Sequence, residues 1–293
     1  MLFWPMPDSA PDVPTLAIVT VSFNSAEVLG PFLDSIRAAT TGSPRVVVVD
    51  NASSEFEAVR AAVAGSDAQL LELPQNLGYG TAMNRGVSSL PATVDWVLLS
   101  NPDVILQPHA LDELVSGARQ RDDAGALGPR VLQPDGSVYP SARRLPSLRN
   151  GIGHALFGRA IPRNPWTRRY RADELPTGEP RVAGWLSGSC LLVRRSAFDA
   201  VGGFDEGYFM YFEDVDLGAR LARAGYTSVY WPAAVVTHTG AHSTAFRAAE
   251  MEKAHHVSAY RYVARKYSAW YLWPVRVVLR VGIFARGLVV SRG

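Results

Sequence analysis

The sequence predicts an α/β protein: a central, mainly parallel sheet covered by helices on both faces, followed by a helical C-terminal tail. Two observations lead to this prediction. Through the first 130 residues, apolar runs of strand length alternate with amphipathic segments of helix length. The runs are apolar at nearly every position, which is typical of parallel strands buried on both faces. The chain has 293 residues, 47% of them hydrophobic, and is therefore long enough to bury a large core.

The alternation can be followed element by element. The expected strands, rich in valine, isoleucine or leucine, are residues 16–22, 45–50, 68–74 and 95–100. The expected helices include residues 28–36, 53–65, 78–90 and 108–120. In the second helix we expect Ser53 or Ser54 at the N-cap and Gly65 at the C-cap. Pro108 suits the first turn of the fourth helix.

Net charge and cysteine content narrow the class of protein. The formal charge is +2 and the pI is about 8.7, which is too weakly basic to indicate a nucleic-acid partner. Cys190 is the only cysteine, which excludes an intramolecular disulfide framework and a cysteine-based zinc cluster and fits a reducing compartment. The first 14 residues do not have the pattern of a signal peptide, and no run of 18 apolar residues predicts a membrane span.

Polar side chains follow two of the expected strands. Asp50 and Asn51 end the second strand, and Asn101 and Asp103 follow the fourth in the stretch SNPD. Ligands of open α/β sheets bind beyond the carboxyl ends of the strands, so Asp50 and Asn51 are candidates for contacting a base or ribose. Asp103 offers hard oxygen ligands for Mg²⁺ or Mn²⁺, and Asn101 offers a neutral one. The alternatives are a helix cap at Asp50 and an ordinary proline turn at residues 101–103.

The stretch NLGYGTAMNRG follows the third strand. Gly78 and Gly80 allow close approach of the backbone, and the helix that starts there offers free N–H groups to a phosphate. The stretch is neither a P-loop nor a dinucleotide fingerprint. Turns between strands and helices also use glycine routinely, so these glycines alone are a weak signal.

Three acidic residues crowd the start of a later helix. Asp214 lies on the same helical face as Leu217 and so points toward the core, whereas Asp216 lies near Arg220 and can form an i,i+4 ion pair. Acidic residues at a helix N-terminus are also favoured by the helix dipole, which explains part of the crowding around Glu213. An inward-pointing Asp at a helix start is nevertheless a good candidate for a general base.

Two further groups flank this helix in the sequence. Trp185, Ser187 and Gly188 precede it, and an aromatic ring beside small residues can form a platform for a sugar, although a core tryptophan is the commoner case. His238 and His242 follow the next apolar run and are candidates for binding a metal or phosphate, or structural histidines. We expect His255 and His256 to lie on a helical surface.

Together and in this order, the motifs resemble the family 2 inverting glycosyltransferases of the GT-A fold, and more narrowly their rhamnosyltransferase branch. The resemblance covers about residues 15–245. It rests on IVTVSFNS, VVVVDNAS, NLGYGTAMNRG, LLSNPDV, WLSGSCLLVRRSAFDAVGGFDEGYFMYFEDVDLGARLARAGY and HTGAHST.

The resemblance implies a role for each motif. Asp214 would be the catalytic base, Asp103 the ligand of the Asp-x-Asp metal motif, and His238 a further metal or diphosphate contact, with Asn101 and His242 as secondary metal candidates. The nucleotide sugar would be bound by Asp50, Asn51, Asn76, Gly78, Asn84, Asn101 and Asp103. The acceptor would be bound by Trp185, Ser187, Gly188, Glu213 and Asp216. Many relatives have Asp where this chain has Asn101, so we expect the ion to depend more on the donor diphosphate than on the protein.

The implied activity is transfer of a sugar, L-rhamnose from dTDP-rhamnose, to N-acetylglucosamine on a polyprenyl diphosphate during synthesis of a cell-wall linker. A divalent ion, Mg²⁺ or Mn²⁺, would assist. Three rival hypotheses remain: a glycosyltransferase with another donor or acceptor, a nucleotidyltransferase, and a noncatalytic sugar-binding protein. The sequence leaves open both the pyrimidine base of the donor and a homo-oligomeric state.

We expect four segments along the chain. Residues 1–14 form a flexible lead-in, and residues 15–130 form the half that binds the nucleotide sugar. Residues 131–245 form the acceptor-binding and catalytic half, with a long arginine-rich excursion at 134–182. Residues 246–293 form a helical tail.

The tail bears on localisation. Trp270, Tyr271 and Trp273 resemble an interfacial aromatic belt, and Arg276 and Arg280 share one helical face. The tail is therefore expected either to lie on a membrane surface or to pack as an ordinary helix. The first alternative predicts a cytoplasmic protein that is peripheral on the inner face of the plasma membrane.

Overall fold

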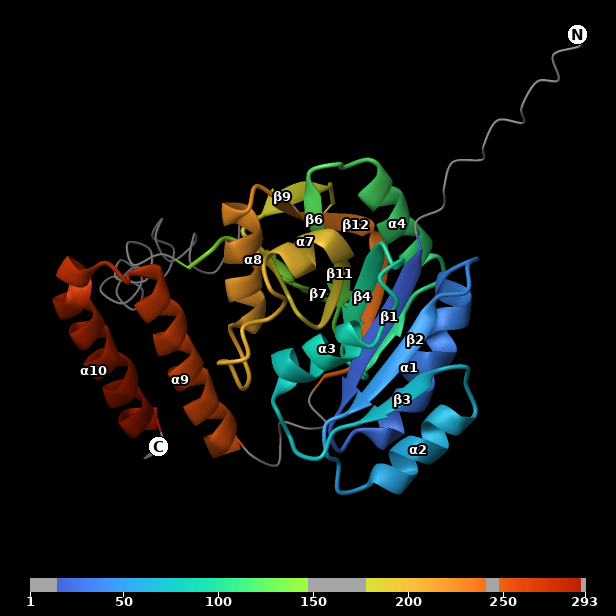
Figure 1. Ribbon diagram of the computed structural model, residues 1–293, viewed down its shortest axis with the longest axis horizontal. Coiled ribbons are helices and arrows are strands. Elements are labelled where there is room, and N and C mark those ends of the chain that lie inside the picture. The colour runs from blue at the N-terminus through green and yellow to red at the C-terminus, as the bar shows by residue number, and fades with distance from the viewer. Residues whose placement is uncertain (1–14, 147–177, 241–247, 291–293) are drawn as a thin grey trace, which may run out of the picture.

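A ten-stranded mixed sheet forms the centre of the protein, and helices cover both of its faces (Figure 1). The computed structural model describes residues 15–146, 178–240 and 248–290. The strands are β1 Leu16–Ser22, β2 Arg45–Asp50, β3 Gln69–Glu72, β4 Trp96–Ser100, β5 Val104–Leu106, β6 Ala124–Leu132, β7 Val138–Tyr139, β8 Ala142–Arg143, β9 Arg181–Ala183, β10 Trp185–Leu186, β11 Cys190–Arg194 and β12 Thr227–His238. The helices are α1 Ala26–Ala39, α2 Phe56–Ala64, α3 Tyr79–Ser88, α4 Ala110–Arg119, α7 Arg195–Ala200, α8 Glu213–Arg223, α9 Ala248–Lys266, the 3₁₀ helix η2 Trp270–Leu272 and α10 Trp273–Val290.

The strand order explains where the polar strand ends meet. The order is β3-β2-β1-β4-β11-β6-β12-β5, with β7 beside β6 and β9 beside β12. Strands β1 to β4 are parallel, and β11 runs antiparallel between β4 and β6. Ser100 lies opposite Cys190, and Val104 lies opposite His238. The end of β4 is therefore next to the start of β11 and the end of β12.

The strands are buried on both faces, as the continuous apolar runs predict. Ile18 and Val48 belong to one core cluster, under α1, α2 and α4. The neighbouring Val19 and Val49 point the other way, into a second cluster under α3, α7 and α8. Successive side chains alternate between the faces of a strand, so a strand covered on both sides must be apolar throughout.

The structure confirms the predicted α/β architecture and changes several details. The predicted caps Ser53 and Ser54 are wrong because α2 begins at Phe56 with Glu55 at its N-cap, whereas Gly65 is the C-cap as expected. Pro108 lies before α4 and not in its first turn. The expected boundary at residue 130 falls inside β6, so one sheet draws strands from both halves.

The tail forms two neighbouring helices, α9 and α10, and α9 lies between α10 and α8 (Figure 1). A small third cluster joins α9 to α8 and contains Tyr208, Val215, Ala219 and Tyr262. Among the helices of the described residues, none combines the length and apolar character needed to cross a membrane.

Candidate active site

The candidate base Asp214 occupies the first turn of α8 and is held by backbone groups. Its Oδ2 accepts the N–H of Gly188 at 3.0 Å, and its Oδ1 accepts the N–H of Val215 at 2.8 Å. The carbonyl of Gly188 in turn accepts the hydroxyl of Tyr79 at 2.6 Å. Tyr79 is the first residue of α3, so three separate segments fix the orientation of one carboxylate.

The two adjacent carboxyl groups at the start of α8 both have raised pKa values. Burial, and then the charge of Asp214, raises the pKa of Glu213 to about 8. Burial also raises the pKa of Asp214, against the N–H groups of Gly188 and Val215 and the charge of Arg143. Two close carboxylates resist double ionisation. The N–H groups of Gly188 and Val215 favour the charged form of Asp214, so Asp214 is the better candidate for the ionised member of the pair.

Tyr79 keeps its proton and acts as a donor. Burial, followed by the nearby carboxylates of Glu213 and Asp214, raises its pKa well above the ordinary value. The residue was not among the predicted site residues. An aromatic hydroxyl at the first position of a helix that starts beyond a strand end is the signal that would have pointed to it.

The second corner of the site joins the SNPD stretch to the end of β12. Nε2 of His238 lies 3.1 Å from Oδ1 of Asp103 and 3.4 Å from Nδ2 of Asn101. The backbone carbonyl of Asp103 accepts both the N–H and the hydroxyl of Thr239. A pocket of about 250 Å³ opens beside His238, Thr239 and Tyr139.

The loop between β10 and β11 connects the two corners. The N–H of Asn101 donates to the carbonyl of Ser189 at 2.9 Å, while the N–H of the preceding Gly188 holds Asp214. The hydroxyl of Ser187 lies 3.1 Å from that of Ser189. The predicted residues Ser187 and Gly188 thus lie between the candidate base and the candidate metal corner.

The donor set at this second corner fits a divalent ion only in part. Asp103 supplies a carboxylate, His238 an imidazole and Asn101 an amide oxygen, which are suitable ligands for Mn²⁺ or Mg²⁺. Within residues 15–146, 178–240 and 248–290, no three His, Cys, Asp or Glu side chains gather as a metal site. His242 lies outside the described residues. Such a set leaves several ligand positions to be filled by the phosphates of a substrate.

Asp50 retains an unused buried acceptor at the end of β2. Its Oδ2 accepts the N–H of Ser53 at 3.0 Å, which is the capping role considered from the sequence. Its Oδ1 is buried and has no hydrogen-bond partner among the described residues. Buried oxygens are rarely left unpaired, so this atom is available to a ligand.

The side chains of three other residues expected to contact the donor, Asn51, Asn76 and Asn84, form hydrogen bonds within the protein. Asn51 and Asn76 bond to each other at 2.9 Å, and their side-chain oxygens accept the N–H groups of Leu77 and Gly78. Both side-chain groups of Asn84 bond to the backbone of Phe204 at 2.9 Å. These side chains shape the turn before α3 and join α3 to the loop before α8.

Gly78 has a structural reason to be glycine. Its φ is +82°, and a Cβ there would lie 2.2 Å from the carbonyl oxygen of Phe209. That carbonyl accepts the N–H of Tyr79 at 3.1 Å. The close approach that the sequence predicted for a phosphate is made here by the chain itself, which covers one amide of the α3 N-terminus.

Trp185 and Asp216, both expected to bind the acceptor, are engaged with arginines. The Arg143 guanidinium stacks over the Trp185 ring at 5.6 Å, and the indole N–H donates to the carbonyl of Arg144. Asp216 forms the predicted i,i+4 pair, with Nε of Arg220 at 2.6 Å, and this prediction is confirmed. Arg143 belongs to the arginine-rich excursion expected at residues 134–182, and its position near Asp214 was not predicted.

The backbone just before α8 is in an unusual conformation. Tyr211 and Phe212 both have a φ of 68°, and Phe212 is the N-cap of α8. This left-handed region costs roughly 1–2 kcal/mol for a residue with a side chain. Such strain occurs mostly at functional sites, where surrounding structure enforces it.

Comparison with known proteins identifies the family. The sequence matches the family described as "Glycosyltransferase like family 2" over residues 14–257. The chain belongs to this family. The family 2 glycosyltransferase is 46% identical, over 286 residues, to an "N-acetylglucosaminyl-diphospho-decaprenol L-rhamnosyltransferase" of Mycobacterium tuberculosis, and the match covers 94% of this chain and 93% of that protein. It is 32% identical over 195 residues to the "Rhamnosyltransferase WbbL" of Escherichia coli, covering 64% and 71% of the two chains.

Solved structures confirm the predicted GT-A fold for this family 2 glycosyltransferase. A mannosyltransferase of Pyrobaculum calidifontis in complex with GDP-Man and Mn²⁺ is 16% identical, with a TM-score of 0.59 over 97% of this chain and 78% of that chain. S. aureus TarS 1-349 in complex with UDP gives a TM-score of 0.55 at 15% identity, over 83% of this chain and 65% of that chain. At these identities the likeness concerns the fold alone.

Proposed function

We propose that this family 2 glycosyltransferase transfers L-rhamnose from dTDP-rhamnose to N-acetylglucosamine on a polyprenyl diphosphate, with inversion at the anomeric carbon. The observation that carries the proposal is the 46% identity, over nearly the whole of both chains, to the mycobacterial L-rhamnosyltransferase. The backbone-held carboxylate of Asp214 supplies the group that the reaction needs. A role in building a cell-wall linker is part of the same proposal and rests on the family resemblance of the sequence.

Asp214 acts as the general base in a single displacement. It takes the proton of the acceptor hydroxyl while that oxygen forms a bond to C1 of the rhamnose. The bond between C1 and the diphosphate oxygen breaks, and the nucleoside diphosphate leaves with the electron pair. Attack from the face opposite the leaving group inverts C1. Gly188 and Val215 hold the carboxylate for this transfer, and Tyr79 holds Gly188.

The donor lies along the strand ends from Asp50 to Asp103. The free buried oxygen of Asp50 supports a contact with the base or ribose. Asp103 and His238, with Asn101 in support, would hold a divalent ion on the diphosphate side, and the ion would offset the charge that develops on the leaving group. The mannosyltransferase of similar fold was solved in complex with Mn²⁺, which supports the proposal of a divalent ion here.

The tail brings the enzyme to the membrane that holds a polyprenyl acceptor. Exposed apolar side chains support this: Trp270 is 82% exposed, Tyr271 63%, Trp273 59% and Val278 70%. Arg276 turns toward the protein, because it donates to the carbonyls of Tyr267 and Ala269, whereas Arg280 stacks over Tyr260 and remains exposed. The exposed apolar and aromatic side chains therefore supply the proposed membrane contact.

A donor panel tests the proposed function. Purified enzyme is given dTDP-rhamnose, UDP-glucose, UDP-galactose or GDP-mannose with a polyprenyl-diphosphate-linked N-acetylglucosamine, and the lipid product and the released nucleotide are measured. We expect transfer with dTDP-rhamnose, release of dTDP in equal amount, and loss of at least ~100-fold in Asp214→Asn. Transfer of a different sugar would identify another donor. Release of pyrophosphate from a nucleoside triphosphate would favour a nucleotidyltransferase.

A further inference from the structure

The strained turn at Tyr211 and Phe212 is covered by a helix that comes from another part of the chain. Two consecutive L-residues with left-handed backbone conformation need contacts with the surrounding structure to keep that conformation. Helix α9 provides these contacts, although its first residue lies 36 positions after Phe212 in the sequence.

Three residues of α9 contact the turn: Ser258, His255 and Tyr262, whose ring lies 5.8 Å from that of Phe212. The hydroxyl of Ser258, which is 3% exposed, donates to the carbonyl of Met210 at 2.7 Å. The ring of His255 lies 5.5 Å from that of Tyr211 and 5.4 Å from that of Phe212. These contacts fall on the two residues with positive φ and on the residue just before them. His255 is exposed on α9, as predicted, whereas its contact with the turn was not predicted.

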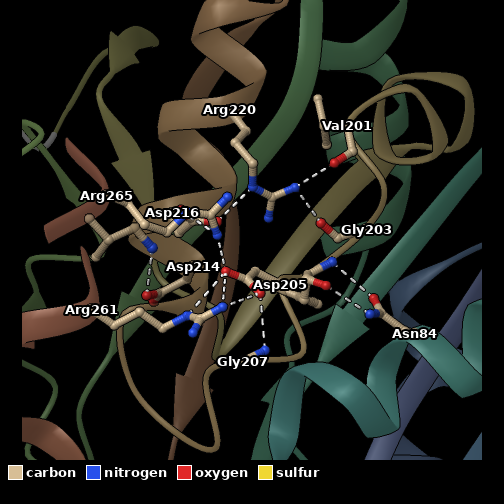
Figure 2. A network of polar contacts seen from close by, with 12 residues as sticks. Asn84, Val201, Gly203, Asp205, Gly207, Asp214, Asp216, Arg220, Arg261 and Arg265 are labelled. Atoms are coloured by element: carbon tan, nitrogen blue, oxygen red, sulfur yellow. Dashed lines mark hydrogen bonds and ion pairs between the residues drawn. The ribbon is translucent and has the colours of Figure 1, made fainter. Parts of the chain in front are cut away.

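The preceding part of the loop is held from two sides. On the side of α9, Arg261 and Arg265 both pair with Asp205, and Arg265 reaches to 3.9 Å from Asp216 of α8 (Figure 2). On the side of α3, Asn84 bonds to the backbone of Phe204. The loop before α8 is thus clamped between a helix of the nucleotide-sugar half and a helix of the tail.

We propose that α9 belongs to the catalytic apparatus: Ser258 and His255 are positioning residues that hold the 211–212 turn and, through it, the carboxylate of Asp214. The proposal rests on the proposed function, in which Asp214 is the base. Asp214 follows Phe212 by two residues, so the dihedral angles of the turn set the direction in which α8 begins. A turn that relaxes to negative φ rotates the first turn of α8 and pulls the Asp214 carboxylate away from the N–H of Gly188.

Paired substitutions test the proposal in the full-length enzyme. His255→Ala removes the ring, His255→Phe keeps one, Ser258→Ala removes the hydroxyl, and Val257→Ala is the control at a neighbouring α9 position that is 48% exposed. We expect His255→Ala and Ser258→Ala each to lower kcat by roughly fivefold with the KM for the donor unchanged. His255→Phe and Val257→Ala should keep the wild-type kcat. Hydrogen exchange should quicken at the amide of Asp216, which donates to the carbonyl of Phe212.

The outcomes separate this proposal from the one on which it rests. If both alanine variants keep the wild-type kcat and the wild-type hydrogen exchange at Asp216, α9 has no positioning role. The assignment of Asp214 as the base would still stand, provided that Asp214→Asn is inactive. An active Asp214→Asn would overturn the base and with it the catalytic role of α9. An equal loss of kcat in His255→Phe and His255→Ala would also overturn the positioning role of α9. A raised KM for the donor with unchanged kcat would do the same.

Discussion

Gly188 donates its backbone N–H to Oδ2 of Asp214 at 3.0 Å, and the two residues belong to different elements of the fold. The same loop passes through Ser189, whose carbonyl accepts the N–H of Asn101. One short loop therefore fixes both the candidate base and the start of the candidate metal corner. A displacement of this loop changes the distance between the two groups that a glycosyl transfer must bring to opposite sides of C1.

Removing the hydroxyl of Tyr79 should loosen the loop that holds Asp214 without abolishing donor binding. Tyr79→Phe leaves the carbonyl of Gly188 without its donor at 2.6 Å, so the loop that holds Asp214 loosens. We expect kcat to fall about fivefold, equivalent to about 1 kcal/mol, with little change in the KM for the donor. Steady-state kinetics check this, with Tyr226→Phe as the control. A larger effect on KM than on kcat would show that Tyr79 serves the donor.

Asp103 should matter more than Asn101. Asp103→Ala removes a carboxylate 3.1 Å from His238, and we expect kcat/KM to fall by at least ~100-fold. Asn101→Ala should cost only about tenfold because an amide is a weaker ligand. Titrations with and without dTDP measure the affinity of the enzyme for Mn²⁺ directly. We expect tight Mn²⁺ binding only in the presence of the nucleotide. Asn101→Asp should bind Mn²⁺ without nucleotide. The reverse order of the two alanine variants would assign the ligand to Asn101.

Glu213 should make stability depend on pH in an unusual direction. Its pKa rises from about 4.5 to about 8 on folding, so the folded state holds a proton that the unfolded state has lost between these values. Stability then falls as pH rises from about 5 to 8. Glu213→Gln should remove this loss and raise the free energy of unfolding at pH 8.5 by on the order of a few kcal/mol. Urea unfolding at pH 5.5 and 8.5 tests it.

The control for that experiment is Glu57→Gln. Glu57 is an exposed partner of Arg60, so its removal should shift stability equally at both pH values. A Glu213→Gln variant that gains no stability at pH 8.5 relative to pH 5.5 would mean that folding does not raise the pKa of Glu213.

Membrane binding should depend on aromatic side chains and hardly on salt. Trp270→Ala and Trp273→Ala should each lower partitioning onto phosphatidylcholine vesicles by roughly tenfold, because each removes a large exposed apolar group. Vesicle sedimentation at 50 and 500 mM NaCl measures this. Val182→Ala, at an apolar position on β9 that is 55% exposed, is the control. Binding that requires anionic lipid and disappears at high salt would assign the contact to basic residues instead.

Local patterns in the sequence predicted a large part of the fold and some of the site. The unbroken apolar runs at β1, β2 and β4 predicted strands buried on both faces, since covering both sides of a strand leaves no polar position. Spacing within α8 predicted that Asp214 faces inward and that Asp216 pairs with Arg220. These features depend on residues within one element, so their geometry follows from the 3.6-residue or 2-residue repeat.

Only the tertiary structure decided which elements meet at the site. Gly188 and Asp214 are 26 residues apart, Tyr79 and Gly188 are 109 apart, and Asn101 and His238 are 137 apart. Periodicity carries no information about such partners, because it specifies the face on which a side chain lies and not what packs against that face. For the same reason the sequence could not show that Arg276 turns toward the protein, or that His255 of the tail contacts the turn before α8.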